Sequence, residues 1–351
     1  MPSDLFAGGY TGRRVLVTGH TGAVGGWMTR WLVALGAEVV GLSRGRHAPV
    51  MPPPADVHSV AGTVTDAELM RHLFREHRVE TVFHLAGQAV VADGFTEPRR
   101  TFTDNVLGTV AVLDAALTEP ATRAVVVIGT PAGGIPAGDT PLAPYAGSKA
   151  AAEAVVAGYA HEQTQRAAGR ATPLAVAVAR PGVMVGGDWT PGRLLTDVVA
   201  AIRAGSPVVL RGGDAVRPWQ HMLDGVSGLL TLGARLMCGP APRRSYAFGR
   251  PPDEDDRTSA EVVRAFLRAY GHPDWALRAG GGTGLDRLTL DCAVATRELG
   301  WKPVWNLDRT VAAASRWYHA HGRPAALSEA TDAILDEYID EGRRAGAVWT
   351  A

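Results

Sequence analysis

Apolar residues in the first 183 positions follow two alternating periods. Short apolar runs rich in β-branched residues are typical of strands buried on both faces of a parallel sheet, and they occur at residues 14–18, 37–44, 79–87, 123–130 and 173–183. Apolar residues at helical spacing predict helices between these runs, at residues 27–36, 66–77, 101–117 and 145–163. Thr65 or Asp66 is placed to cap the second helix, and the Pro-rich residues 45–63 predict a loop. The alternation predicts an α/β fold with a Rossmann-type, doubly wound parallel sheet.

The regular alternation of predicted strands and helices ends after residue 182. Helices are predicted at 194–205, 221–237 and 261–271, and short strands at 207–212 and 244–249. Residues 285–301 predict a strand and a short helix, and the tail from residue 309 is largely helical. We therefore expect a Rossmann domain over residues 1–182, with contributions from about residues 220–250. A smaller, mostly C-terminal substrate domain is expected from residues 183–219 and 251–351.

Composition limits the partners that the chain can have. Lys and Arg together number 35 and so do Asp and Glu, so no net basic charge attracts nucleic acid. No apolar run reaches the roughly 18 residues that span a bilayer, and the first 14 residues lack the apolar stretch of a signal peptide. We expect a cytoplasmic protein without a membrane or nucleic-acid partner. Cys238 and Cys292 have no metal-ligand spacing, and we expect no metal site.

A glycine-rich turn, GHTGAVG at residues 19–25, joins the first strand to the first helix. Gly19 permits the tight turn, Gly22 lets the backbone approach a pyrophosphate, and Gly25 allows close packing of helix on strand. The helix N-terminus would face the anion. A plain turn with fortuitous glycines is the weaker alternative, so we expect a dinucleotide bound by Gly19, Thr21, Gly22, Ala23 and Val24.

The end of the second strand bears on the choice between NAD and NADP. An acidic residue there binds the ribose hydroxyls of NAD, whereas an arginine accommodates a 2′-phosphate. This chain has Ser43 and Arg44 and no acid at that position. The pattern favours NADP modestly, although a solvated Arg44 without any role is about equally plausible.

Tyr145-x-x-x-Lys149 opens the helix predicted at 145–163 and follows Thr130, which ends a strand. One helical turn places Lys149 on the same face as Tyr145. We expect the ammonium group and the positive nicotinamide to lower the pKa of the tyrosine. The phenolate could then take or return the proton of a carbinol while hydride moves to or from the nicotinamide.

These motifs resemble those of the extended short-chain dehydrogenase/reductases of nucleotide-sugar metabolism, the NAD-dependent epimerase/dehydratase family, and most closely the CDP-glucose 4,6-dehydratases. The resemblance covers nearly the whole chain and rests on VTGHTGAVGGWMTRWL, VFHLAGQ, NVLGT, YAGSKAAAE, GGDW, VRPWQHMLDGVSGLLTLGARL, YAFG and LDCAVATRELGWKP. It implies an enzyme that holds NAD or NADP, acts on a nucleotide diphosphate sugar and forms a homodimer.

The resemblance also implies individual contacts. Further cofactor contacts are expected from Ser43, Arg44, Leu85, Ala86, Gly87, Asn105, Tyr145, Lys149 and Pro181. Substrate contacts are expected from Gln88, Thr130, Val183, Arg193, Arg217 and His221. Arg217 suits a diphosphate, since its fork pairs with phosphate oxygens, and Arg193 is a weaker candidate for the same role. For both arginines a surface ion pair is the alternative.

The chain departs from the dehydratases at one decisive place. Those enzymes follow the Ser/Thr with an Asp that acts as acid and a Glu or Lys that acts as base, whereas this chain has Pro131 and Ala132. Neither side chain can transfer a proton, and such help contributes about 10²–10⁴-fold to rate per group. Smaller departures are Val183 in place of Asn, GGDW in place of GGGDW, and Thr63 in place of the Asp near the adenine.

Four functions remain open. Sugar 4-epimerases of this superfamily also follow the Ser/Thr with small neutral residues, so the leading hypothesis is an NDP-hexose or NDP-heptose 4-epimerase with Thr130, Tyr145 and Lys149 as its catalytic residues. The second is an NADPH-dependent 4-ketoreductase. The third is a 4,6-dehydratase whose acid and base lie elsewhere, for which Asp139, His20 and His84 are candidates. The last, a non-catalytic cofactor-binding module, has no need of the intact Tyr145–Lys149 pair.

Overall fold

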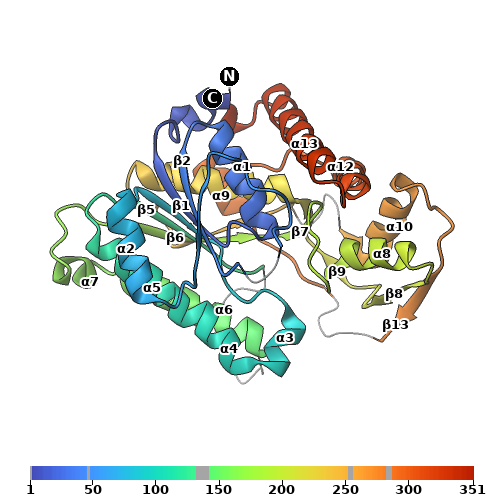
Figure 1. Ribbon diagram of the computed structural model, residues 1–351, viewed down its shortest axis with the longest axis horizontal. Coiled ribbons are helices and arrows are strands. Elements are labelled where there is room, and N and C mark those ends of the chain that lie inside the picture. The colour runs from blue at the N-terminus through green and yellow to red at the C-terminus, as the bar shows by residue number, and fades with distance from the viewer. Residues whose placement is uncertain (1, 46–47, 132–141, 252–255, 282–286) are drawn as a thin grey trace.

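A seven-stranded parallel sheet forms the centre of the molecule. The computed structural model describes residues 2–45, 48–131, 142–251, 256–281 and 287–351. The sheet has the order β11-β6-β5-β4-β1-β2-β3, and Figure 1 labels four of its strands, β1, β2, β5 and β6. Its strands are β1 (Arg14–Thr18), β2 (Glu38–Ser43), β3 (His58–Ala61), β4 (Thr81–His84), β5 (Ala124–Ile128), β6 (Ala175–Pro181) and β11 (Ser245–Phe248). The predicted α/β fold with a doubly wound parallel sheet is confirmed.

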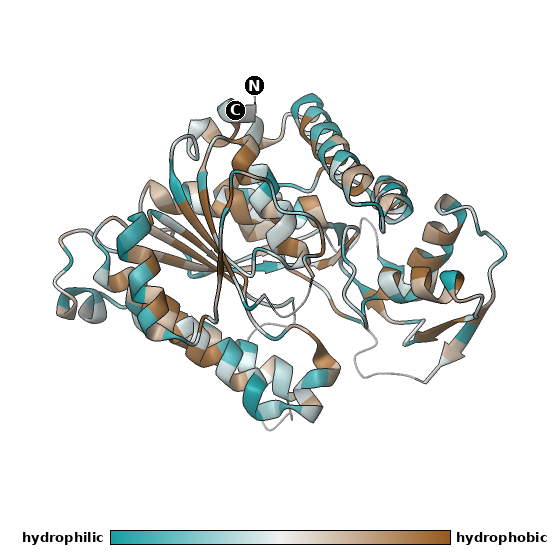
Figure 2. Cartoon of the chain, in the orientation of Figure 1, coloured by the Kyte–Doolittle hydropathy of each residue, from teal (hydrophilic) through white to brown (hydrophobic). Residues whose placement is uncertain are grey.

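Helices cover both faces of this sheet. One face carries α1 (Ala23–Ala34) and α9 (Met222–Met237), and the other carries α2 (Ala67–His77), α5 (Gly108–Thr118) and α6 (Pro144–Tyr159). Successive residues of β1 alternate between the two cores: Val15 and Val17 pack with α1 and α9, whereas Leu16 packs with α2 and α5. Because both faces of the inner strands are buried, a strand such as β5 is continuously apolar. Figure 2 shows brown strands in the sheet and a teal outer side on α2.

A smaller lobe lies beside the carboxyl ends of the strands (Figure 1). It contains α8 (Leu194–Arg203) and α10 (Ser259–Ala269) with the strand pairs β8 (Val208–Arg211)–β13 (Leu277–Gly280) and β9 (Val216–Arg217)–β12 (Arg257–Thr258). The pair β7 (Val183–Val185)–β10 (Trp219–His221) connects this lobe to the sheet. Helix α12 (Leu307–Ala320) packs on α10, and α13 (Pro324–Arg344) packs on α12 and α1.

The remaining elements are short. They are η1 (Pro2–Gly8), α3 (Val91–Thr96), α4 (Pro98–Phe102), the π-helical turn η2 (Thr103–Leu107), α7 (Glu162–Ala167), α11 (Ala293–Leu299) and η3 (Val348–Thr350). No helix in the described ranges is both long and apolar enough to cross a bilayer.

Five sequence expectations differ from the structure. The predicted loop at 45–63 contains β3, an edge strand whose His58 and Ser59 are exposed, so it has no apolar run to reveal it. β13 was not predicted either, since two of its residues are exposed. The helix predicted at 101–117 is interrupted by η2, and the one at 145–163 divides into α6 and α7. Within residues 287–301 the strand expected before α11 is reduced to a single bridge between Arg287 and Val216.

Candidate active site

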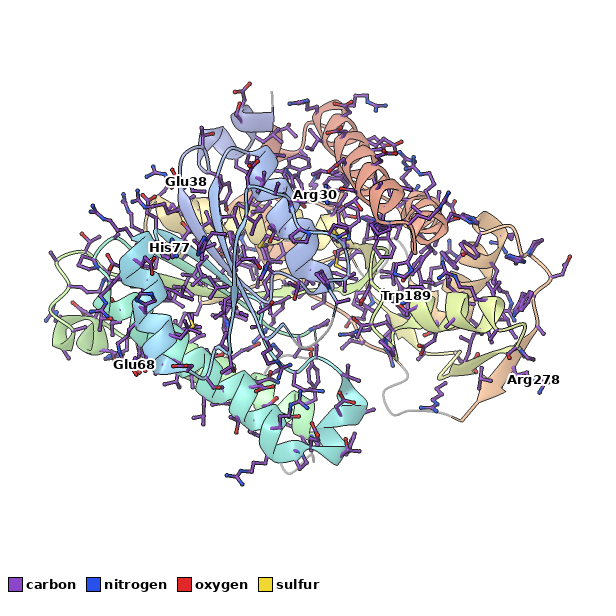
Figure 3. All side chains as sticks on the ribbon, in the orientation of Figure 1. Arg30, Glu38, Glu68, His77, Trp189 and Arg278 are labelled. Atoms are coloured by element: carbon purple, nitrogen blue, oxygen red, sulfur yellow. The ribbon has the colours of Figure 1, made fainter. Side chains whose placement is uncertain are left out.

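A cleft of about 780 Å³ opens at the carboxyl ends of the central strands, against the smaller lobe. Ligands of open α/β sheets bind at this edge. The sheet side of the cleft includes the glycine-rich turn, residues 85–88, Thr130, Tyr145 and Lys149. The lobe side includes Met184, Asp188, Trp189 and Arg193. Figure 3 shows Trp189 at the junction of sheet and lobe, where its ring stacks on that of His321 with centroids 3.8 Å apart.

The glycine-rich turn has the geometry that a pyrophosphate needs. Gly19 has a φ of +77°, and a Cβ added at Gly25 would lie 2.1 Å from the Gly19 carbonyl oxygen, so only glycine fits there. Helix α1 begins at Ala23 without a side-chain cap, which leaves first-turn N–H groups available to an anion. All five predicted turn contacts, Gly19, Thr21, Gly22, Ala23 and Val24, line the cleft.

Asn105 does not line the cleft but holds two of its segments in place through hydrogen bonds. Its Oδ1 accepts a hydrogen bond from the Gln88 N–H at 2.8 Å, and its Nδ2 donates to Ser148 Oγ at 2.8 Å. Ser148 in turn donates to the Tyr145 carbonyl oxygen. A Cβ at Gly87 would lie 2.5 Å from Asn105 Oδ1, so glycine is required for this contact. The π-helical turn thereby fixes both the shelf at residues 85–88 and the start of α6.

Tyr145, Lys149 and Thr130 meet on the sheet side of the cleft. Burial lowers the pKa of Lys149 to about 8, with Glu153 opposing, and its Nζ donates to the Ile128 carbonyl at 3.1 Å. Burial raises the pKa of Tyr145, while the positive charge of Arg193 and a hydrogen bond with the Thr130 side chain lower it. Arg193 is thus a cation that acts on Tyr145, and the effect expected from Lys149 and the nicotinamide remains a prediction.

Pro131, the residue after Thr130, lines the cleft. Ala132 and Asp139 lie outside the described residues. His20 and His84 do not line the cleft: His20 Nε2 pairs with Ser59 Oγ, and His84 is held between the hydroxyls of Thr18 and Thr109. Burial lowers the pKa of His84 to about 3. Both histidines are thus enclosed by the protein.

Two carboxylates of the described chain do line the cleft, Asp104 and Asp188. Asp188 belongs to the GGDW motif, and its Oδ1 accepts a hydrogen bond from the Thr190 N–H at 2.9 Å. Its Oδ2 lies 3.8 Å from Arg193 Nε. The sequence identified this motif and assigned its Asp no role. No group of three or more His, Cys, Asp or Glu side chains is placed to hold a metal ion in the part of the chain that is described.

The predicted cofactor contacts Ser43, Arg44, Leu85, Ala86, Gly87 and Pro181 also line the cleft. Among the predicted substrate contacts, Gln88, Val183 and Arg193 do so. Gln88 is 7% exposed, and its Oε1 has no hydrogen-bond partner within the described ranges.

Arg217 and His221 are not among the described residues that line the cleft. His221 is 1% exposed and caps α9, accepting a hydrogen bond from the Leu223 N–H. Its ring packs against Trp27 and Trp305. Arg217 lies on β9 and donates to the Val216 carbonyl. Their substrate contacts remain predictions. The cleft is also lined by Met184, Met222 and Leu288. The sequence did not single these residues out, because nothing distinguishes them there from other apolar residues.

Known proteins resemble this chain over most of its length. The model of the NAD dependent epimerase/dehydratase family matches residues 15–245. A CDP-glucose 4,6-dehydratase of Salmonella typhimurium is 31% identical, over 95% of this chain and 98% of its own. A UDP-glucose 4-epimerase of Streptococcus mutans is 26% identical, over 88% of this chain and 97% of its own. The structure of a dTDP-glucose 4,6-dehydratase of Streptomyces venezuelae with NAD bound matches with a TM-score of 0.74 and 25% identity, over 88% of this chain and 97% of its own.

Proposed function

The chain belongs to the NAD dependent epimerase/dehydratase family, a family of enzymes, and on that premise we propose that it is a nucleotide-sugar 4-epimerase. Its substrate is an NDP-hexose or NDP-heptose, and its cofactor is NAD or NADP. The observation that carries the proposal is the end of β5, where Thr130 adjoins Tyr145 in the cleft and Pro131 follows. This site keeps the groups that oxidise a carbinol, and proline in the acid's position has no proton to give.

The residues of the cleft fit a nicotinamide dinucleotide. The glycine-rich turn and the uncapped start of α1 would hold its pyrophosphate, and the shelf at residues 85–88 with Pro181 lies along the same cleft. When bound, the nicotinamide supplies an acceptor and donor of hydride.

Tyr145 is the proposed proton acceptor and donor. Its phenol oxygen takes the proton of the C4 hydroxyl as C4 is oxidised to a ketone, and returns it when the ketone is reduced from the opposite face. Burial raises the pKa of Tyr145, and Arg193 and the Thr130 side chain oppose that rise, which favours the phenolate that this step requires. The C4 configuration is inverted, and because no proton leaves C5 and no hydroxyl leaves C6, no acid or base is needed at those carbons.

Gln88 and Arg193 are the proposed substrate contacts. The unpaired Gln88 Oε1 can accept a hydrogen bond from a sugar hydroxyl. The Arg193 side chain is 45% exposed at the cleft and donates to the Ala89 carbonyl, which leaves further N–H groups for diphosphate or sugar oxygens.

The test is turnover of a panel of NDP-hexoses and NDP-heptoses by the full-length protein in D₂O, without added reductant, followed by NMR at C4 and C5. We expect the C4 epimer, with hydrogen retained at both carbons and no net consumption of cofactor. Tyr145→Phe, with the same cofactor content, should be inactive. A 4-keto-6-deoxy product with deuterium at C5 would instead assign a dehydratase. Stoichiometric NADPH consumption with a 4-ketosugar would assign a ketoreductase.

We also propose a homodimer formed through the helices that follow residue 91. Phe95, Phe102 and Leu107 are 64%, 42% and 57% exposed, and α3, α4 and η2 all pack beside α6. Exposed apolar side chains gathered on neighbouring elements indicate an interaction surface. Light scattering should give twice the chain mass, and Leu107→Glu should lower it toward the monomer. A monomeric wild-type protein at micromolar concentration would contradict the proposal.

A further inference from the structure

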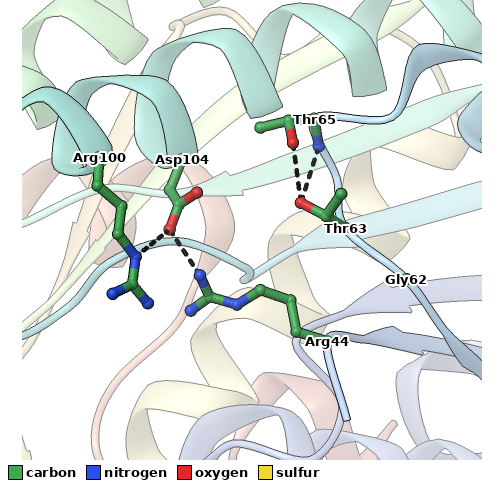
Figure 4. Close-up of a pocket in the computed structure, with 6 residues that line it drawn as sticks. All are labelled: Arg44, Gly62, Thr63, Thr65, Arg100 and Asp104. Carbon is green, nitrogen blue, oxygen red and sulfur yellow. Dashed lines mark hydrogen bonds and ion pairs between the residues drawn. The ribbon is translucent and has the colours of Figure 1, made fainter. Parts of the chain in front are cut away.

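A second cavity, of about 420 Å³, adjoins the cleft where the second strand ends. Figure 4 shows the residues that line it, Arg44, Gly62, Thr63, Thr65, Arg100 and Asp104. Arg44, Gly62, Thr63 and Asp104 also line the main cleft, so the two spaces are continuous. The end of this strand is where a Rossmann fold contacts the adenosine ribose. The cavity is therefore placed to receive the adenosine end of the dinucleotide.

Asp104 of η2 dominates the charges in this cavity. Its Oδ2 accepts a hydrogen bond from Arg44 Nη1 at 2.8 Å and lies 3.7 Å from Arg100 Nε (Figure 4). Arg100 also donates to Glu97. The side chain of Asp104 is 13% exposed, against 35% for Arg44 and 42% for Arg100. The carboxylate is thus the least exposed member of the cluster, and it holds the nearest N–H groups of both arginines.

The formal charge of this cluster is zero, because Asp104 and Glu97 balance Arg44 and Arg100. A 2′-phosphate carries close to two negative charges and needs unpaired arginine N–H groups. Arg44 keeps further N–H groups beside the one bonded to Asp104, but the Asp104 carboxylate offsets the charge of Arg44 and would repel the phosphate. A free 2′-hydroxyl has no such conflict, and Asp104 Oδ1, which accepts no hydrogen bond from the described residues, can accept one from it.

We propose that Asp104 sets the choice of dinucleotide by neutralising Arg44 and Arg100, so that the site selects NAD over NADP. The inference rests on the proposed function only in requiring that the cleft bind a nicotinamide dinucleotide. This choice is the opposite of the modest preference for NADP that Arg44 alone suggests. The sequence does not reveal it, because Asp104, which balances Arg44, lies 60 residues away in the chain. The missing acid at the end of β2 is supplied by η2.

Binding of NAD⁺ and NADP⁺ to the cofactor-free, full-length protein tests this directly by titration calorimetry. The wild type should bind NAD⁺ at least tenfold more tightly. Asp104→Asn, which keeps the shape and removes the charge, should tighten NADP⁺ binding at least tenfold and change NAD⁺ binding less than threefold. The double variant Arg44→Ala/Asp104→Asn should lose most of this gain. Asp93→Asn removes an exposed acid of α3 outside the cavity and should leave both affinities unchanged.

If Asp104→Asn does not fold, Arg44→Ala is a second test variant, because Arg44 is more exposed and its loss should disturb the fold less. This variant should bind NAD⁺ about as tightly as the wild type and should still bind NADP⁺ more weakly than NAD⁺. A wild-type preference for NADP⁺, or an unchanged affinity ratio in a folded Asp104→Asn protein, overturns the inference while leaving the epimerase proposal intact. Preserved NAD⁺ selectivity in a protein that fails to epimerise any sugar supports the inference and removes the epimerase. Absence of binding by either dinucleotide overturns both.

Discussion

Replacing Lys149 with methionine should stabilise the folded protein near neutral pH while abolishing turnover. Burial lowers the pKa of Lys149 from 10.5 to about 8, and one pKa unit corresponds to about 1.4 kcal/mol. Holding the charged ammonium in the folded state therefore costs about 3 kcal/mol. Methionine fills a similar volume without this cost, but it leaves the Ile128 carbonyl without its donor, which forfeits about 1 kcal/mol. We expect a net gain of about 2 kcal/mol at pH 7.

The pH dependence separates this cause from general repacking. Between the folded pKa of about 8 and the unfolded value near 10.5, the unfolded chain binds more protons at Lys149 than the folded one, so wild-type stability rises with pH in this window. The advantage of Lys149→Met should be complete below pH 8 and should shrink as pH rises toward 10.5. Urea denaturation at pH 7, 8, 9 and 10 measures it. Lys302→Met, at the exposed second lysine of the chain, is the matched control and should show no such trend. Destabilisation of Lys149→Met at pH 7, or an advantage that does not change with pH, would refute the reasoning.

Three further changes test the site and its scaffold. Tyr145→Phe removes the phenol oxygen that exchanges the proton, so kcat should fall at least 10²-fold while calorimetry gives an unchanged cofactor Kd; retained turnover would exclude Tyr145 as the acid–base. Gly25→Ala would place a Cβ 2.1 Å from the Gly19 carbonyl oxygen and should abolish dinucleotide binding. Its control is Gly158→Ala on α6, where nothing lies within 4 Å of the Cβ; this variant should bind the dinucleotide normally, and its free energy of unfolding in urea should rise by about 0.4–1 kcal/mol. Equal dinucleotide binding by both variants would contradict the role assigned to the turn. Asp66→Ala removes the acceptor of the Glu68 and Leu69 N–H groups and should lower the free energy of unfolding by about 0.5–2 kcal/mol. An unchanged midpoint of urea unfolding would contradict this role of Asp66.

The parts of the fold that the sequence predicted are those fixed by local pattern. Strands buried on both faces, such as β1 and β5, are continuously apolar, and the glycine-rich turn and the Tyr145–Lys149 spacing are short motifs. β3 escaped prediction because His58 and Ser59 on an exposed edge satisfy no hydrophobic pattern. The interruption at η2 escaped it because apolar spacing continues through the π-helical turn.

The parts of the site that escaped prediction depend on residues far apart in the chain. Arg193 acts on Tyr145 across the cleft, and Asp104 pairs with Arg44 from a different element. The packing of the His221 ring against Trp27 and Trp305 was not foreseen either, and its substrate contact remains a prediction. Charge and chemistry can be assigned to each of these residues from sequence, but their partners are set by how the elements pack.

The partners of the cleft side chains also bear on the choice between epimerisation and dehydration. Eliminating water from a 4-ketosugar needs a base at C5 and an acid at the C6 hydroxyl, whereas inversion at C4 needs only one group that exchanges a proton at O4. In the described cleft, Asp104 lies in the cavity next to Arg44 and is paired with it, and Asp188 is engaged through both oxygens by the Thr190 N–H and Arg193. Tyr145, by contrast, has a hydroxyl partner in Thr130 and a cation in Arg193 that assist proton exchange at a single atom. If Asp188 nevertheless supplied the acid, Asp188→Asn would abolish formation of a 4-keto-6-deoxy product while Tyr145-dependent oxidation at C4 continued. An epimerase should instead yield no 4-keto-6-deoxy product, either as the wild type or as Asp188→Asn. Because Asp188 is the cleft carboxylate best placed to act as the acid, comparing the products of these two proteins decides between epimerisation and dehydration.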